Sequence, residues 1–238
     1  MELKYYNTKE KGAAMKIERN IAWGKHKINM DYLKHIDDFS NIIYQISGKT
    51  KDLLNDVYSG EEIQLPISVD KVAQHLGVEI YTKNLNLANP RKENQCIGEL
   101  YGNEISIEET VSWSLRRYTI AHEIGHYMIE DTKETAQYAL PLLACDSSEL
   151  LADLYALFLL IPLENFLKEF KEYIDNIQKY PIDITEWWKT LSEKTEVPYH
   201  SIAGGYMYFR LAALQYYKDR IKGKPLREQI ENWGDVFY

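Results

Sequence analysis

Residues 122–126 read His-Glu-Ile-Gly-His, and this pentapeptide is the strongest indication of the fold and chemistry of the chain. It lies in a stretch, Thr110 to Met128, that we predict to be one helix. Four residues turn an α-helix by about 400°, so His122 and His126 project from nearly the same face. Two imidazoles placed in this way can bind one metal ion, and zinc favours such a pair. The alternative is a helix with two exposed or core-packed histidines and no ion.

A catalytic zinc also needs a third protein ligand and an open position for water. The segment Glu149-Leu-Leu-Ala-Asp153 begins a second predicted helix and places two carboxylates on one face. One carboxylate can bind the ion while the other accepts a hydrogen bond from the second ring nitrogen of a ligand histidine. Glu123 is placed to remove a proton from zinc-bound water. A second interpretation of Glu149, compatible with the first, is an acid that stabilises the start of its helix.

Two blocks of the sequence resemble the ImmA/IrrE family of metallo-endopeptidases. Residues 116–126 are similar to the family block Arg-Phe-Thr-Leu-Ala-His-Glu-Leu-Gly-His. Residues 149–162 resemble a second block, Glu-x-x-Ala-Asn/Asp-x-Phe-Ala, which ends in Met-Pro. Tyr155 stands where Phe is usual and Ile161 where Met is usual, and neither departure touches the predicted metal site.

This resemblance implies a thermolysin-like zinc site in which His122, His126 and Glu149 bind the ion and Glu123 is the catalytic base. Asp153 is expected to accept a hydrogen bond from the ring nitrogen of a ligand histidine that does not face the ion. Family members cut or inactivate a partner repressor that binds DNA through a helix-turn-helix, so the resemblance implies a protein substrate of that kind. The alternative function is a zinc-containing regulator that inactivates its partner by binding, without turnover.

The charge of the chain is concentrated in its middle third. The 238 residues carry a formal net charge of −8, and residues 91–162 alone hold 5 basic and 12 acidic residues, a net of −7. An ordinary solvated face is one explanation, and attraction of cations or of a basic partner is the other. Because repressors are basic, we expect this segment to favour encounter with one. The predicted strand Glu104–Glu108 is expected to bind an extended substrate segment along its edge.

Composition excludes several classes of protein. A hydrophobic fraction of 45% and an aromatic fraction of 13% allow a sizeable core, which excludes a disordered chain. Two cysteines, Cys96 and Cys145, do not make a disulfide framework and predict free thiols of a reducing compartment, with a single bridge as the alternative. Residues 1–20 lack the apolar stretch of a secretory signal, and the longest apolar run, 150–163, contains Asp153. We therefore expect a cytoplasmic protein that does not contact a membrane.

The order of predicted elements is helix, strand, strand, strand, helix, which indicates an α+β fold. We expect a small antiparallel or mixed sheet packed on zincin-type helices that carry the metal motif. A first helix is predicted at Asp31–Ile46, ended by Gly48, and a second runs from Ser68 as N-cap to Gly77. A hairpin is predicted to turn at Gly102-Asn103. The predicted organisation is a tail at residues 1–30, a zincin-like metallopeptidase core at 31–162, and a helical extension at 163–238.

The last two predicted helices, Thr185–Thr195 and Pro198–Ile221, resemble a helix-turn-helix in length and turn position. The second helix offers Arg210 as its only Lys or Arg up to Leu214, so direct binding of nucleic acid is not expected. The basic cluster at residues 218–227 is interpreted as a solvated helix end.

The donor that stabilises the oxyanion of peptide hydrolysis is left open by the sequence. The candidates are Tyr155, Tyr199, His200 and Tyr206, and each is expected more often to be a packing residue. Cys145 is a further candidate, because a thiolate near the zinc could occupy its open position.

Overall fold

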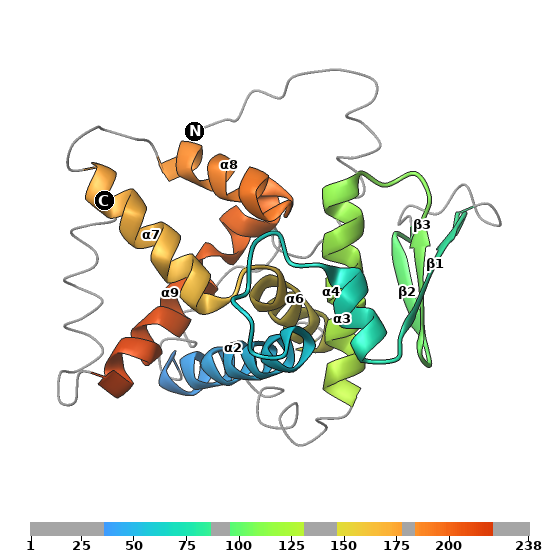
Figure 1. Cartoon of the computed structure of the whole chain (residues 1–238), viewed down its shortest axis with the longest axis horizontal. Helices are drawn as coiled ribbons and strands as arrows, with labels where there is room; N and C mark the ends of the chain where they lie inside the picture. The colour runs from blue at the N-terminus through green and yellow to red at the C-terminus, as the bar shows by residue number, and fades with distance from the viewer. Residues whose placement is uncertain (1–35, 87–95, 131–146, 178–183, 221–238) are drawn as a thin grey trace.

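The computed structural model describes residues 36–86, 96–130, 147–177 and 184–220 (Figure 1). A small sheet lies at one side of the molecule beside α4, and α6 lies between α4 and α2. The elements in chain order are α2 (Ile36–Tyr58), α3 (Val69–His75), β1 (Glu79–Lys83), β2 (Gly98–Tyr101), β3 (Glu104–Glu108), α4 (Trp113–Glu130), α6 (Ser147–Leu160), α7 (Leu163–Ile177), α8 (Ile184–Thr195) and α9 (Tyr199–Arg220). The predicted α+β class is confirmed, with a small mixed sheet beside the helix that carries the metal motif.

The sheet is mixed, with strand order β1-β3-β2. The predicted hairpin is confirmed: β2 and β3 pair antiparallel around Gly102, whose φ of +60° is the left-handed conformation that glycine adopts readily. β1 pairs parallel to β3, with Ile80 opposite Ile105. Both edges of β3 are therefore occupied by other strands. The expectation that substrate binds along the edge of Glu104–Glu108 is wrong, because β3 is the central strand, and among the described strands the open edges belong to β1 and β2.

The first described helix is longer than the sequence predicted. α2 passes through Gly48 and continues to Tyr58, because Thr50, Leu54 and Val57 continue the buried stripe beyond it. A glycine inside a helix costs about 1 kcal/mol relative to alanine, and burial of these side chains outweighs that cost. The helix instead ends where Gly60 takes a φ of +77°. The predicted start at residue 31 lies outside the described residues.

The short helix α3 begins and ends as the sequence predicted, within a residue or two. The side chain of Ser68 accepts a hydrogen bond from the backbone N–H of Lys71 at 3.3 Å, which caps the helix start. Gly77, with a φ of +70°, reverses the chain after the last turn. β1 follows directly, so α3 fixes where the sheet begins.

Helix α6 is the core of the molecule. Every residue from Leu150 to Leu163 is buried, and Pro162 prevents the helix from continuing into α7. Among the described residues no single helix has the length and apolar character needed to cross a bilayer. The pair Ser148–Leu160 and Leu163–Tyr173 passes that test jointly, by length and composition only, and is bent by 66° at its break.

The helices after residue 162 share one hydrophobic core with the helices before it. Phe166 of α7 stacks on Phe209 of α9 with ring centroids 4.1 Å apart, and Phe209 also meets Phe158 of α6 at 5.1 Å. Gly205 of α9 lies so close to Leu157 that an added Cβ would come within 2.5 Å of its side chain. The described parts of both predicted regions therefore pack as one unit, and a functional boundary at residue 162 stays a prediction. The predicted tail, residues 1–30, lies outside the described residues.

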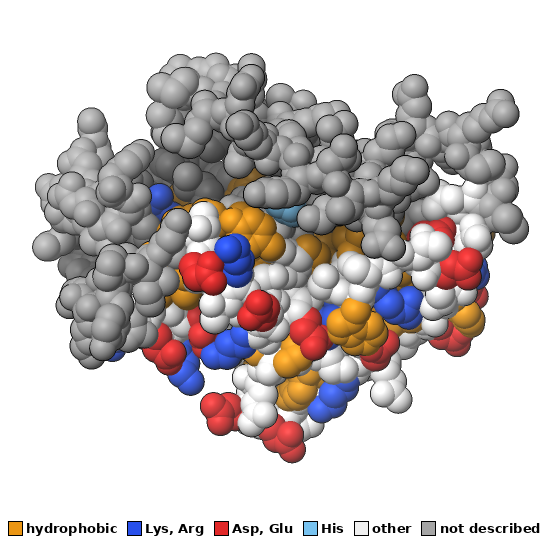
Figure 2. Space-filling model, turned by 90° about the horizontal axis from the view of Figure 1, so that it is seen from above, with side chains coloured by type: hydrophobic (Ala, Val, Ile, Leu, Met, Phe, Trp, Pro, Cys, Tyr) orange, Lys and Arg blue, Asp and Glu red, His pale blue; other side chains and the backbone are white. Residues whose placement is uncertain are grey.

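Acidic and basic side chains are interspersed on the face seen in Figure 2. The described part of this face therefore does not present a field of one sign.

Among the large apolar side chains of the described chain, Trp113 is 58% exposed and Tyr101 is 86% exposed.

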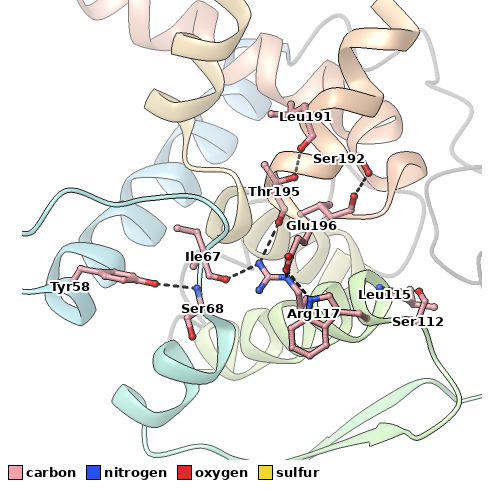
Figure 3. A network of polar contacts seen from close by, with 12 residues as sticks. Tyr58, Ile67, Ser68, Ser112, Leu115, Arg117, Leu191, Ser192, Thr195 and Glu196 are labelled. Carbon is pink, nitrogen blue, oxygen red and sulfur yellow. Dashed lines mark hydrogen bonds and ion pairs between the residues drawn. The ribbon is translucent and has the colours of Figure 1, made fainter.

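A buried arginine connects α4 to two other parts of the chain (Figure 3). Arg117 donates through Nη2 to the backbone oxygen of Ile67 at 2.7 Å and to that of Thr195 at 3.4 Å. Its Nε lies 3.4 Å from Oε2 of Glu196, which also accepts a hydrogen bond from Trp113 Nε1 at 2.8 Å. Burial lowers the pKa of Arg117, an effect that Glu196 opposes. This contact fixes the turn between α8 and α9 against α4.

Candidate metal centre

Two helices provide every side chain of the candidate centre, and they cross in direct backbone contact. Gly125 of α4 faces α6, where a Cβ added to it would lie 2.7 Å from the backbone oxygen of Ala152 and 2.8 Å from its Cα. Real Cβ atoms do not approach backbone atoms this closely. Glycine is therefore the residue that allows α4 and α6 to approach until their side chains converge.

The three predicted ligands lie together at this crossing. The Nε2 atoms of His122 and His126 are 3.1 Å apart. The carboxylate of Glu149 lies 3.3 Å from the first nitrogen through Oε2 and 3.2 Å from the second through Oε1. Glu149 is also in the first turn of α6, so its helix-start role and its place at the centre coexist.

These separations fit a tetrahedral metal ion. A zinc ion with bonds of about 2.1 Å to nitrogen and oxygen holds neighbouring donors about 3.4 Å apart. The candidate donor atoms of His122, His126 and Glu149 all lie within 4.8 Å of one another. Two imidazoles and one carboxylate are also the donor types of a catalytic zinc site that keeps a position open. The residues present therefore fit the ion that the sequence predicted.

Asp153 lies behind the first histidine, as expected. Its Oδ1 is 2.8 Å from Nδ1 of His122, and the carboxylate is buried, with 3% of the residue exposed. With this contact holding a proton on Nδ1, Nε2 is the nitrogen left to bind an ion. The same Oδ1 accepts a hydrogen bond from the hydroxyl of Tyr118 at 3.2 Å.

The charges of the centre stabilise one another. Burial acts to lower the pKa of His122, but hydrogen bonds to Asp153 and Glu149 outweigh it and raise this pKa to about 10. Hydrogen bonds from His122 and His126 lower the pKa of Glu149 well below its ordinary value. A cation is therefore favoured between these groups, and zinc binding would displace a proton from the histidine.

Glu123 lies beside the histidines and under the sheet. It is 8% exposed, and burial raises the pKa of its carboxyl group, which the two histidines partly oppose. A Cβ added at Gly98, the first residue of β2, would lie 3.1 Å from Oε1 of Glu123 and 2.3 Å from the side chain of Thr119. The main chain of β2 therefore lies directly against the predicted base.

Among the other candidates, buried Tyr155 packs at the crossing itself, where a Cβ added at Gly125 would lie 3.0 Å from its Cβ. The ring of Tyr206 packs in an aromatic cluster with Phe166, Phe170 and Trp188, and burial raises its pKa. Tyr199 packs on Trp188 and His200. The oxyanion donor stays open. Cys145 and the side chains of the basic cluster at 218–227 lie outside the described residues, and the thiol of Cys96 donates a hydrogen bond to the backbone oxygen of Gly98 at 3.1 Å.

Sequence reasoning missed three residues of the centre. Tyr118 lies four residues before His122, the same spacing that revealed the histidine pair, so this face of the helix could have been extended backwards. Gly125 lies inside the motif itself, but a glycine at a helix crossing has no sequence pattern of its own. Gly98 approaches Glu123 only because the sheet packs on α4, which is a tertiary contact.

Comparison with known proteins identifies one family. The family model described as IrrE N-terminal-like domain, Peptidase_M78, matches residues 73–204, more than half of the chain. The matched range begins in α3, ends in α9 and contains all the residues of the candidate centre. No curated protein matches the chain.

Proposed function

This chain belongs to the peptidase M78 family of metallopeptidases, and on that premise we propose that it is a zinc-dependent endopeptidase. The observation that carries the proposal is the convergence of His122, His126 and Glu149 beside the buried carboxylate of Glu123. An ion in this position would bind through both Nε2 atoms and the carboxylate of Glu149. When bound, zinc supplies a polarised carbonyl and a bound water whose pKa is about 7.

Glu123 is the proton carrier of the proposed reaction. Its carboxylate takes a proton from the attacking water and later gives it to the nitrogen of the leaving amine. Burial raises its pKa, so the carboxylate accepts the proton more readily than an exposed glutamate does. Asp153 acts through His122, holding the ring so that Nε2 faces the ion.

The substrate backbone is proposed to lie along the open edge of β2. This strand begins at Gly98, whose main chain lies against Glu123, and its other edge is paired with β3. An extended segment paired with this edge would pass beside the base, with main-chain hydrogen bonds fixing its register. This placement replaces the one on β3, where no edge is open.

The proposed substrate is a basic helix-turn-helix repressor, which would be cut in the cytoplasm. The support for a basic partner is the net charge of −7 over residues 91–162. The face seen in Figure 2 mixes both signs of charge, so its described part does not carry this attraction. Neither the sequence of α9 nor its packing favours direct DNA binding.

The test compares the wild-type chain with Glu123→Gln and with Glu172→Gln, a matched control at an exposed position of α7. Each protein is incubated with candidate helix-turn-helix repressors, beginning with any encoded beside its gene, and cleavage is followed by mass spectrometry. We expect Glu123→Gln to cut about 10²–10⁴-fold more slowly while it keeps stoichiometric zinc, and the control to cut normally.

Three outcomes would count against the proposal in different ways. Protein purified without stoichiometric zinc, and unaffected by chelation, would exclude the metal centre. Glu123→Gln cutting at the wild-type rate would exclude Glu123 as the base. A repressor that is inactivated but never cut by either protein would favour the regulator that acts by binding.

A further inference from the structure

We infer that Tyr118 is a positioning residue of the metal centre, acting through Asp153 on His122. The inference rests on the proposed zinc site and adds a group that neither the motif nor the family assignment contains. Tyr118 donates its hydroxyl hydrogen to Oδ1 of Asp153 at 3.2 Å, and this is the oxygen that lies 2.8 Å from Nδ1 of His122.

The spacing of these residues along two helices explains the arrangement. Tyr118, His122 and His126 follow one another at intervals of four on α4, so they form one row on its face. Glu149 and Asp153 form a shorter row on α6. Contacts join His126 to Glu149 at one end of the rows and Tyr118 to Asp153 at the other. The rows therefore run antiparallel, and Tyr118 completes the end that is deepest in the core.

Burial makes the hydroxyl of Tyr118 important. The residue is 2% exposed and Asp153 is 3% exposed, so neither polar group has bulk water as an alternative partner. A buried tyrosine hydroxyl and a buried carboxylate are each costly without a hydrogen bond. Their mutual contact meets part of both requirements within the core.

Two donors on one oxygen also restrict the carboxylate. Asp153 with a single donor can rotate about its Cβ–Cγ bond, and the ring of His122 can follow it. With Tyr118 on one side and His122 on the other, the direction of Oδ1 is fixed, and so is the plane of the imidazole. Tyr118 therefore sets where Nε2 of His122 points without contacting the ion or the substrate.

The experiment measures zinc affinity, by competition with a chromogenic chelator, for the wild-type chain and for Tyr118→Phe. The matched control is Tyr173→Phe, which removes a hydroxyl from a tyrosine that is also buried but packs between Phe170 and Trp187, away from the centre. Because partners behind a ligand change metal affinity by about 10–100-fold, and Tyr118 is one contact further away, we expect a loss of about 3–10-fold for Tyr118→Phe. The control should retain wild-type affinity.

A double-mutant cycle with Asp153→Ala tests the route of the effect. If Tyr118 acts through Asp153, Tyr118→Phe should change zinc affinity by less than about twofold once Asp153 is absent. Melting temperatures are recorded with and without zinc, because a purely structural tyrosine would lower both equally and leave the zinc-induced increase unchanged.

The outcomes separate this inference from the proposed function. Wild-type protein that binds no zinc would overturn the metal centre and this inference with it. Wild-type protein that binds zinc, together with a Tyr118→Phe variant of equal affinity, would overturn the role of Tyr118 alone. Additive losses in the cycle would also overturn it, because they would show that Tyr118 acts independently of Asp153.

Discussion

At the residue scale, the candidate metal centre depends on the absence of a side chain as much as on the predicted ligands. Gly125 allows the backbones of α4 and α6 to touch, and this approach brings Glu149 to the two histidines. The spacing between the two helices therefore decides whether Glu149 reaches the histidines, and the lack of a Cβ at Gly125 allows that spacing.

We predict that Gly125→Ala lowers zinc affinity about tenfold or more and destabilises the protein by about 1–3 kcal/mol. The added Cβ meets backbone atoms of Ala152, so α6 must move and carry Glu149 with it. The control is Gly48→Ala in α2, where an added Cβ meets nothing within 4 Å and should stabilise the protein by up to about 1 kcal/mol. Zinc competition and urea unfolding provide the two measurements. Unchanged zinc affinity in Gly125→Ala would contradict the account.

The sequence could predict the parts of the candidate centre whose geometry is set within one helix, but not the parts that depend on contacts between elements. His122, His126, Glu149 and Asp153 lie within two helices at intervals of four, so their faces could be derived from helix geometry alone. That the two helices face one another was supplied by the resemblance to a family. Gly98 could not be assigned to the centre, because its contact with Glu123 depends on how a strand packs on a helix.

At the element scale, the predictions from sequence failed on where a helix ends and on which strands pair. The turn at Gly102 was predictable because it is local, whereas pairing of β1 with β3 joins residues about 25 positions apart and makes β3 central. α2 passed through Gly48 because burial by other helices outweighed a local preference. In both cases a tertiary contact decided what local propensity left open.

Arg117 is a buried polar connection between elements. Replacing it by methionine keeps an unbranched apolar stem but removes the donors to Ile67 and Thr195, whose carbonyls would remain buried. We predict that Arg117→Met lowers the free energy of unfolding by about 2–4 kcal/mol.

The matched control is Arg116→Met, which alters the neighbouring arginine. Arg116 is partly exposed and donates to Thr82 Oγ1 at 3.0 Å, so its loss should cost about 1 kcal/mol or less. Urea denaturation of both variants gives the comparison. Equal losses would show that the contact between α4 and the α8–α9 turn contributes little.

At the scale of the whole molecule, α6 organises both the core and the chemistry. Its apolar residues are covered by α2, α4 and α9, and its first two turns carry Glu149 and Asp153. The candidate metal centre therefore lies at the end of the most buried element of the described chain, where its geometry is supported by the packing of helices from both predicted regions.

The shortness of β2 has a consequence for what the proposed enzyme can cut. Four residues offer about four main-chain hydrogen bonds to a substrate, each worth about 0.5–1.5 kcal/mol. Association costs about 4 kcal/mol or more, so pairing with this strand alone leaves at most about 2 kcal/mol of net binding, a dissociation constant of about 30 mM or weaker.

We therefore predict that a short peptide spanning the scissile bond has a KM of about 1 mM or higher, and that the intact partner has a KM at least about tenfold lower. Steady-state cleavage of both substrates measures this, with Glu123→Gln as the inactive control. Equal KM values would place all recognition in the strand. Unequal values would mean that docking through another part of the partner raises the local concentration of the scissile segment at β2. The strand itself would then contribute little to the choice of the bond that is cut.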